Sequence, residues 1–251
     1  MEFQQYFTYP NNFEESYNLI RKKEERILNL DEIKLLPQTD PQYIHHKEWN
    51  QRVGSTNKFL NYIRTKRKPK VLDLGCGNGW LTHKIAIEAD YVTGVDINKL
   101  ELEQAEQLLS EFKNVKLIYG NILDINFEDK YDIILLNASI QYFESVPLLL
   151  NRLRLNLTNQ GEIHILDSPV YGSNREAMNA RKRTEEYYNK NDAPHMVKFY
   201  FHHTFQSLKG VDYTVMYNPK SIVNRLLKRF IPISPFFWVC IRNKSNNDIN
   251  Y

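Results

Sequence analysis

Cysteine is scarce in this sequence, with only Cys76 and Cys240 among 251 residues. The two lie far apart and lack the spacing of metal ligands, so the sequence predicts neither a disulfide framework nor a bound metal, and it favours a reducing cytoplasm. No apolar run approaches the roughly 18 residues that a membrane-spanning helix needs, so no membrane span is expected. The first residues also lack the basic and then apolar pattern of a secretory signal.

Excess charge is also small, because 33 Lys and Arg residues face 30 Asp and Glu residues, a formal net charge of +3. Such a mild balance does not by itself favour binding to nucleic acid or to a membrane. Two basic stretches, 66–68 and 220–229, give weak support to an RNA partner. The hydrophobic content of 42% suffices for one large domain or for one domain with an appendage.

Glycine is sparse as well, but three of the nine glycines alternate in one stretch, VLDLGCGNGW at 71–80. Residues 70–74 have the pattern of a short buried strand, and residues 81–89 have that of a helix. Glycine lets the backbone come close to a ligand, and the free N–H groups at a helix start then face that ligand. A strand, a glycine turn and a helix start open a nucleotide site at the carboxyl end of a first strand.

An acid at the end of the next predicted strand, 91–96, completes this pattern. The Asp96 carboxylate is suited to accept two hydrogen bonds from a ribose diol, which occurs in both NAD and S-adenosylmethionine. The dinucleotide fingerprint is Gly-x-Gly-x-x-Gly, whereas this chain has Trp80 at the last position. Asp73, before the first glycine, repels a phosphate and attracts an ammonium or a sulfonium. The spacing therefore favours S-adenosylmethionine over NAD.

Five blocks resemble class I S-adenosylmethionine-dependent methyltransferases over about residues 68–167. They are VLDLGCGNGW, VTGVDIN, YGNI at 119–122, YDIILLNAS at 131–139 and LTNQGEI at 157–163. The resemblance implies an α/β, Rossmann-like fold with a seven-stranded, mostly parallel sheet and an antiparallel last strand. It further implies a helical N-terminal lid over 1–67, a cofactor-binding domain over 68–251 and a cap at about 168–208.

The resemblance also implies which residues contact the cofactor, by matching its motifs position by position. Asp73 and Asn137 are expected to hold the methionyl ammonium, and Asp96 the ribose. Asn121 stands where the family usually has an Asp that bonds the adenine amino group, and its side-chain oxygen accepts the same bond. The full set is Asp73, Gly75, Cys76, Gly77, Asn78, Asp96, Ile97, Asn121, Ile122, Asn137 and Ser139.

Hydrophobic periodicity extends the prediction along the rest of the chain. Helices are expected over 13–30, 56–67, 98–112, 146–157, 175–190 and 219–230. Further strands are expected over 115–119, 133–136, 162–167, 211–217 and 236–242. Residues 159–161 are expected to form a turn. The helix over 219–230 is basic and amphipathic, and packing on the sheet is favoured over contact with a membrane or an acidic partner.

No catalytic residue can be assigned from the sequence, but four candidates lie in the predicted cap. They are His202, His203, His195 and Tyr171, and a histidine that titrates near neutral pH is suited to deprotonate a hydroxyl. A packed aromatic cap without chemistry is the favoured alternative. His45, His46 and Trp49 are further candidates for lining the site, although a buried Trp49 and two surface histidines are favoured.

These observations predict in-line methyl transfer from S-adenosylmethionine to an unidentified small-molecule acceptor. The sequence Asn137-Ala138-Ser139-Ile140 replaces the Asn/Asp-Pro-Pro-Tyr/Phe motif of enzymes that methylate adenine or glutamine nitrogen, which disfavours those substrates. A non-catalytic S-adenosylmethionine-binding subunit, an RNA methyltransferase and an NAD-dependent oxidoreductase remain as alternatives. The last is disfavoured by the glycine spacing.

Overall fold

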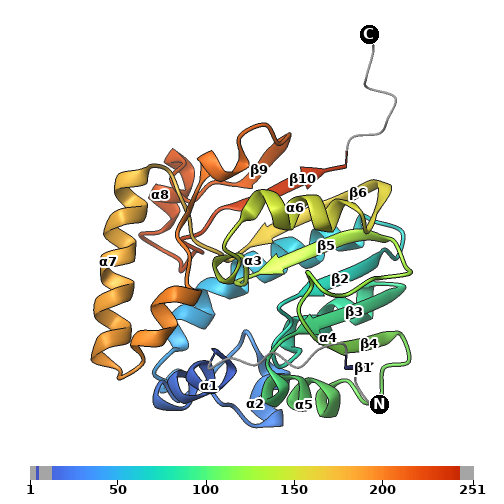
Figure 1. The fold of residues 1–251 in the computed structure, drawn as a ribbon, viewed down its shortest axis with the longest axis horizontal. Coiled ribbons are helices and arrows are strands. Elements are labelled where there is room, and N and C mark those ends of the chain that lie inside the picture. The colour runs from blue at the N-terminus through green and yellow to red at the C-terminus, as the bar shows by residue number, and fades with distance from the viewer. Residues whose placement is uncertain (1–3, 6–12, 244–251) are drawn as a thin grey trace.

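A single sheet runs through the computed structural model, which describes residues 4–5 and 13–243 (Figure 1). The strand order is β1-β4-β3-β2-β5-β6-β10-β9, and β10 runs antiparallel to both of its neighbours while the other pairs are parallel. The strands are β1 (Gln4–Gln5), β2 (Lys70–Leu74), β3 (Tyr91–Asp96), β4 (Val115–Tyr119), β5 (Tyr131–Asn137), β6 (Leu157–Leu166), β9 (Tyr213–Tyr217) and β10 (Trp238–Arg242). The predicted mostly parallel sheet with an antiparallel last strand is confirmed, and the two-residue β1 adds to it beside β4.

Helices cover both faces of this sheet (Figure 1). They are α1 (Phe13–Lys23), α2 (Leu30–Leu35), α3 (His46–Arg64), α4 (Trp80–Glu88), α5 (Lys99–Leu108), α6 (Val146–Arg154), α7 (Asn174–Lys190) and α8 (Ile222–Leu227). Shorter 3-10 helices are η1 (Ile140–Tyr142), η2 (Pro194–Phe199) and η3 (Phe205–Leu208). The excursion between β6 and β9 contains α7, η2, η3 and a small parallel sheet of β7 (Val170–Tyr171) and β8 (His203–Thr204).

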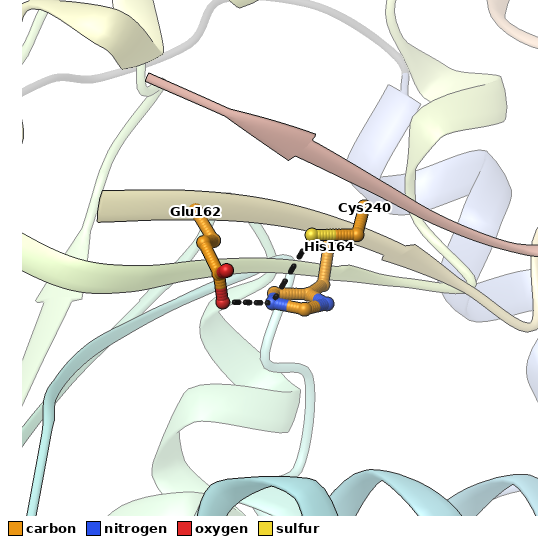
Figure 2. A group of neighbouring side chains, drawn as sticks. All are labelled: Glu162, His164 and Cys240. Atoms are coloured by element: carbon orange, nitrogen blue, oxygen red, sulfur yellow. Dashed lines mark hydrogen bonds and ion pairs between the residues drawn. The ribbon is translucent and has the colours of Figure 1, made fainter. Parts of the chain in front are cut away.

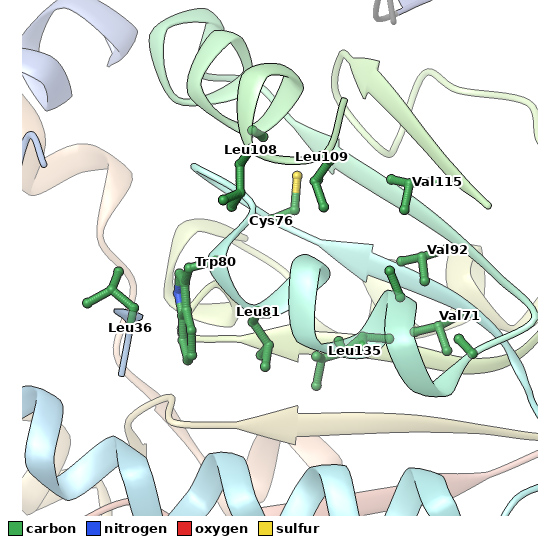
Figure 3. Close-up of a cluster of buried hydrophobic side chains, with 14 of the residues drawn as sticks. Leu36, Val71, Cys76, Trp80, Leu81, Val92, Leu108, Leu109, Val115 and Leu135 are labelled. Atoms are coloured by element: carbon green, nitrogen blue, oxygen red, sulfur yellow. The ribbon is translucent and has the colours of Figure 1, made fainter. Parts of the chain in front are cut away.

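Side chains of the parallel strands alternate between two buried clusters, because successive residues of a strand point to opposite faces. Val71 belongs to the cluster beneath α2, α3, α4 and α5, whereas Leu72 belongs to the cluster beneath α6 and η3. Figure 3 shows part of the first cluster, in which Trp80 and Leu81 of α4 accompany Val71 and Val92 of the strands. Both faces of the central strands are therefore covered, as the continuous apolar run of β5 predicts.

Two of the predicted helices have other boundaries in the structure. The helix expected over 13–30 ends early, at Lys23, and residues 24–29 are not helical. Asn29 then accepts a hydrogen bond from the Glu32 backbone and forms a capping box that starts α2 at Leu30. The helix expected over 56–67 begins earlier, at His46, and ends at Arg64.

The turn expected over 159–161 is wrong, since these residues lie inside β6. The pairing of β6 with β5 slips between Tyr131 and Ile133, so the polar residues 158–160 form an irregular stretch of strand and not a reversal. A Cβ on Gly161 would lie 2.9 Å from the Tyr131 carbonyl oxygen, so glycine is needed at this close approach.

The expected packing of the basic helix on the sheet is also wrong. Only Ile222–Leu227 is helical, and the apolar side chains of this segment face water, with Ile222 78% and Phe230 83% exposed. The helical periodicity of residues 219–230 indicates that the apolar residues share one side of the helix, but it does not show which part of the protein covers that side. None of the helices in the described part of the chain is long and apolar enough to cross a membrane.

A third buried cluster joins the N-terminal helix to the excursion between β6 and β9. Phe13 and Ile20 of α1 pack with Tyr188 at the end of α7 and with Met196 of η2. The two segments lie side by side in Figure 1, although most of the sheet separates them in the sequence. Whether residues 1–67 and 168–208 act as a lid and a cap stays a prediction.

A buried acid ties β6, β10 and α3 together. Glu162 is 5% exposed and accepts a hydrogen bond from the Tyr62 hydroxyl at 2.5 Å, with Lys66 Nζ at 3.0 Å and Arg242 Nε at 3.2 Å. Figure 2 shows the carboxylate beside His164, whose Nε2 lies 3.4 Å from Oε2. Although burial acts to raise it, these hydrogen-bond donors hold the pKa of Glu162 well below its usual value.

We expect Glu162→Gln to lower the free energy of unfolding by roughly 1–3 kcal/mol near neutral pH, because an amide leaves charged donors unpaired. The wild type should lose this contribution as the pH falls below about 4.3, the ordinary pKa of a glutamate, because the unfolded chain then takes up a proton before the folded one does. Urea unfolding across this pH range measures both effects. Exposed Glu103→Gln is the control, and equal stability of the Glu162 variant and the wild type would contradict the assignment.

Candidate functional site

A cavity of about 460 Å³, the first cavity, opens at the carboxyl ends of β2, β3 and β5. Parallel strands present their carboxyl ends at one edge of a sheet, so residues from several loops meet there. All of the residues predicted to contact the cofactor lie in its wall, which includes Asp73, Gly75, Cys76, Gly77, Asn78, Asp96, Ile97, Asn121, Ile122, Asn137 and Ser139. The prediction from separate motifs thus converges on a single place.

The glycine turn brings bare backbone to the wall of this cavity. Gly75, Gly77 and Gly79 have φ values of +77°, +53° and +77°, which side chains rarely tolerate. A Cβ on Gly75 would lie 2.6 Å from Cβ of Ser139, and one on Gly79 would lie 2.9 Å from Cβ of Ala105. The turn therefore requires glycine for conformation and for close packing.

Acidic side chains line the first cavity beside the glycine turn and at the end of β3. Asp73 is 2% exposed, and burial raises its pKa to about 6. Asp96 accepts hydrogen bonds from the backbone N–H groups of Gly77 at 2.7 Å and Asn98 at 2.8 Å. Burial, and then the neighbouring Glu101 carboxylate, raise the pKa of Asp96 to about 7. A ligand with positive charge is stabilised between these groups.

The polar side chains of Asn137, Asn121 and Ser139 at the cavity wall differ in their hydrogen-bond partners. Oδ1 of Asn137 is buried and has no hydrogen-bond partner among residues 13–243, so a ligand N–H would satisfy it. The Asn121 side chain accepts a hydrogen bond from the backbone N–H of Leu123 at 3.0 Å. The Ser139 hydroxyl donates to the Leu74 carbonyl oxygen at 2.8 Å. Asn121 and Ser139 thus stabilise their own loops as well as lining the cavity.

Aromatic side chains of α1 and η2, which the sequence did not place at the site, line the first cavity together with Tyr142. Phe13 of α1 packs edge-to-face on Tyr142 and Phe199, with ring centroids 5.8 Å and 5.2 Å away. Tyr17, one helical turn further on, has its ring centroid 6.0 Å from that of Tyr142. The spacing of Phe13 and Tyr17 indicated a helix with an aromatic face, but nothing in the sequence showed that this face covers the site.

Trp49 is both buried, as the favoured interpretation predicts, and part of the cavity lining. The residue is 8% exposed, and its ring centroid lies 5.3 Å from that of Trp80. The neighbouring histidines do not belong to that lining. Nε2 of His45 lies 2.6 Å from the Glu24 carbonyl oxygen, and His46 bonds within its own loop.

A second cavity of about 520 Å³ adjoins the first beneath α1 and α7. The two linings share Tyr17, Arg21, Arg26, Arg52, Ala138 and Tyr142. The remaining wall is supplied mainly by residues of the excursion between β6 and β9, and half of these are tyrosines. The site thus has two compartments with a common boundary.

Of the four catalytic candidates, only Tyr171 lines either cavity, and it lies in the second. Nε2 of His202 lies 2.9 Å from the Thr184 hydroxyl. Nε2 of His203 donates to the Phe143 carbonyl oxygen at 2.9 Å, and His195 is exposed. The structure therefore does not bring these histidines to either cavity, because His202 and His203 bond to Thr184 and Phe143 and His195 faces water.

One group of potential metal ligands occurs in the described residues, and its chemistry is that of a hydrogen bond between a neutral imidazole and a carboxylate. Glu162, His164 and Cys240 have ligand atoms within 4.8 Å of one another (Figure 2). The Trp238 indole donates to Nδ1 of His164 at 3.0 Å, so the proton of the neutral ring is on Nε2, which faces Glu162. A metal would need the lone pair of that nitrogen.

The chain is similar to known methyltransferases. Residues 65–225 match the model of a family described as methyltransferase domain, which is more than half of the chain. The chain belongs to this methyltransferase family. It is an S-adenosylmethionine-dependent methyltransferase domain of class I fold, and S-adenosylmethionine is its cofactor.

Curated relatives in this family have different substrates in their names. A malonyl-[acyl-carrier protein] O-methyltransferase of Priestia megaterium is 32% identical over 43% of this chain, and the match spans 38% of that protein. A ribosomal RNA small subunit methyltransferase A of Staphylococcus carnosus is 27% identical over 72% of this chain and 62% of its own length. The matches share the methyltransferase domain and leave the acceptor open.

Solved structures support the fold. The YcgJ protein of Bacillus subtilis has a TM-score of 0.57 at 16% identity, over 76% of this chain and 99% of its own. The plantazolicin methyltransferase BpumL in complex with S-adenosylhomocysteine has a TM-score of 0.53 at 18% identity, over 92% of this chain and 100% of its own. At such identities the likeness concerns the arrangement of the chain and not its acceptor.

Asp96→Ala is expected to abolish S-adenosylhomocysteine binding in calorimetry, since it removes the only acid at the end of β3 and a partner of the glycine turn. In the wild type the affinity should fall as the pH falls below about 7, because Asp96 takes up a proton there and loses its charge. Exposed Asp124→Ala, outside both cavities, is the control. Unchanged affinity in the Asp96 variant would refute this role.

Proposed function

We propose that this protein transfers a methyl group from S-adenosylmethionine to a small molecule held in the second cavity. The observation that carries the proposal is the common boundary of the two cavities, formed by Tyr17, Tyr142 and Ala138 among others. A donor in the first cavity and an acceptor in the second would meet at this boundary. The volumes of both cavities lie within the roughly 300–1,000 Å³ range of small-molecule sites.

The residues of the first cavity fit the cofactor. Asn137 offers its unpaired Oδ1, and Asp73 its buried carboxylate, to the methionyl ammonium. Asp96 keeps lone pairs for the ribose hydroxyls beside its two backbone partners. Ile97 and Ile122 supply apolar surface for the adenine ring.

When bound, S-adenosylmethionine supplies an activated methyl group, whose bond electrons stay on sulfur while an acceptor lone pair forms the new bond to carbon. The protein's part is then alignment and exclusion of water. Phe13, Tyr142 and Phe199 supply apolar surface to the wall of the first cavity. Alignment of two reactants contributes on the order of 7–11 kcal/mol, whereas a general base contributes only about 10²–10⁴-fold.

The site offers less support for a general base that deprotonates the acceptor than for alignment of donor and acceptor. No histidine lies in the lining of either cavity within the described residues. Burial raises the pKa values of Tyr142, Tyr171 and Tyr200, so these hydroxyls keep their protons near neutral pH. The arrangement suits an acceptor atom that already has a free lone pair, such as a carboxylate oxygen or a neutral amine.

An RNA acceptor is the competing proposal, because ribosomal RNA methyltransferases are among the relatives. The basic stretch 66–68 gives it little support, since Lys66 is held by the buried Glu162 carboxylate at 3.0 Å.

The two proposals separate when the protein receives methyl-labelled S-adenosylmethionine and two fractions of a cell extract, one of small metabolites and one of total RNA. We expect label in the metabolite fraction, at a rate at least about tenfold above that of Asp96→Ala. Label in RNA alone, with strong salt dependence, would overturn the small-molecule proposal. Cofactor binding without transfer to either fraction would favour a non-catalytic subunit.

A further inference from the structure

The second cavity has a surplus of positive charge. Four guanidinium groups lie in its lining, those of Arg21, Arg26, Arg52 and Arg183, against the carboxylates of Glu24 and Glu48. Arginine is rarely gathered around a cavity without a partner, because a guanidinium away from water needs an anion or hydrogen-bond acceptors.

Both carboxylates form ion pairs with one of these arginines, Arg26. Arg26 donates to both oxygens of Glu48, at 3.3 Å and 2.6 Å, and its Nε lies 2.9 Å from Oε2 of Glu24. Glu24 also accepts a hydrogen bond from the Tyr187 hydroxyl. Arg26 therefore has its charge balanced within the protein, and it holds the end of α1 against α3.

The charges of Arg52 and Arg21 are paired with carboxylates less completely than that of Arg26. Arg52 uses only Nη2, which lies 3.0 Å from Oε1 of Glu48, and its Cζ lies 5.0 Å from the Trp49 ring centroid. Arg21 makes two long contacts of 3.4 Å to the same oxygen of Glu101. A guanidinium has five N–H donors, so both arginines keep donors at the boundary that the two cavities share.

Tyrosine hydroxyls add further donors. The hydroxyls of Tyr17, Tyr171, Tyr188 and Tyr200 have no hydrogen-bond partner within the chain that the structure describes. Burial raises the pKa of each of them, so each keeps its proton. The second cavity is thus rich in N–H and O–H groups, and the acceptors of its own glutamates are already occupied.

The first cavity is lined by acids and by arginines, but in different places. Asp73, Asp96 and Glu101 belong to β2, β3 and α5, whereas Arg21 and Arg52 lie at the boundary that the two cavities share. The acids favour a cationic group of the cofactor, and the arginines of the boundary favour an anion beside it.

We propose that the acceptor is a small organic anion whose carboxylate or phosphate group is held by Arg21 and Arg52. The rings of Tyr142 and Tyr200, whose centroids lie 5.8 Å apart, offer an apolar surface to the body of that molecule. The inference rests on the proposed function and adds the chemical class of the acceptor. The carboxylate and phosphate share the chemistry of recognition, since both present several acceptor oxygens to a guanidinium.

The test uses the full protein saturated with S-adenosylhomocysteine and three probes of similar shape. These are phenylacetate, phenyl phosphate and the uncharged phenylacetamide, each titrated by calorimetry. We expect at least one anion to bind about tenfold or more tightly than the amide. The tighter of the two anions identifies the headgroup.

Matched variants locate the anion. Arg52→Gln should weaken anion binding about tenfold, and Arg52→Lys should weaken it less, because lysine keeps the charge but not the planar donors. Glu48 keeps its two hydrogen bonds from Arg26 in both variants, so the fold is expected to persist. Arg175→Gln is the control, since Arg175 is exposed on α7 and lies outside both linings.

Each result has a definite meaning. Failure of S-adenosylhomocysteine to bind the wild type would overturn the proposed function itself. Normal S-adenosylhomocysteine binding, with no probe bound or with the anions no tighter than the amide, would overturn the anionic acceptor alone. The same holds if Arg52→Gln binds S-adenosylhomocysteine and the anion as the wild type does.

Discussion

The hydrogen bond from the Gly77 backbone to the Asp96 carboxylate is the contact on which the site depends. It joins the glycine turn to the end of β3 at 2.7 Å, and the N–H groups of Gly75 and Cys76 add bonds of 2.8 Å and 3.2 Å to the Val95 carbonyl oxygen. Since β3 lies between β2 and β4 in the sheet, the turn is fixed on a rigid element. The cavity wall is thereby shaped by the protein, so little ordering is left for the ligand to induce.

The same acid shows how structure and electrostatics are coupled. Two backbone donors stabilise the Asp96 carboxylate, yet its burial and the nearby Glu101 raise its pKa to about 7. A buried negative charge of this kind is unfavourable in the free protein and is relieved by a cation. Nε of Arg21 lies 3.4 Å from the Glu101 carboxylate, at the boundary that the two cavities share.

The sequence was sufficient for the part of the fold in which local pattern and tertiary structure agree. Glycine spacing, the apolar run of β5 and the acid after β3 each follow from one short segment, and the parallel sheet brings their ends together. The residues that were missed, such as Tyr17 and Arg52, reach the site through contacts between segments distant in the sequence. Periodicity shows that a helix has an apolar or basic side, but it does not show which neighbour that side meets, as the exposed face of α8 demonstrates.

The cluster that joins α1 to η2 also sets an order in time. The ribosome makes the glycine turn, β3 and β5 well before η2, so a growing chain holds every acid of the first compartment while Phe199 is still to come. Until that point Phe13 packs on Tyr17 and Tyr142 but lacks the Phe199 ring. The nascent protein therefore has the residues predicted to contact the cofactor before it has η2, which completes the aromatic wall of the first cavity.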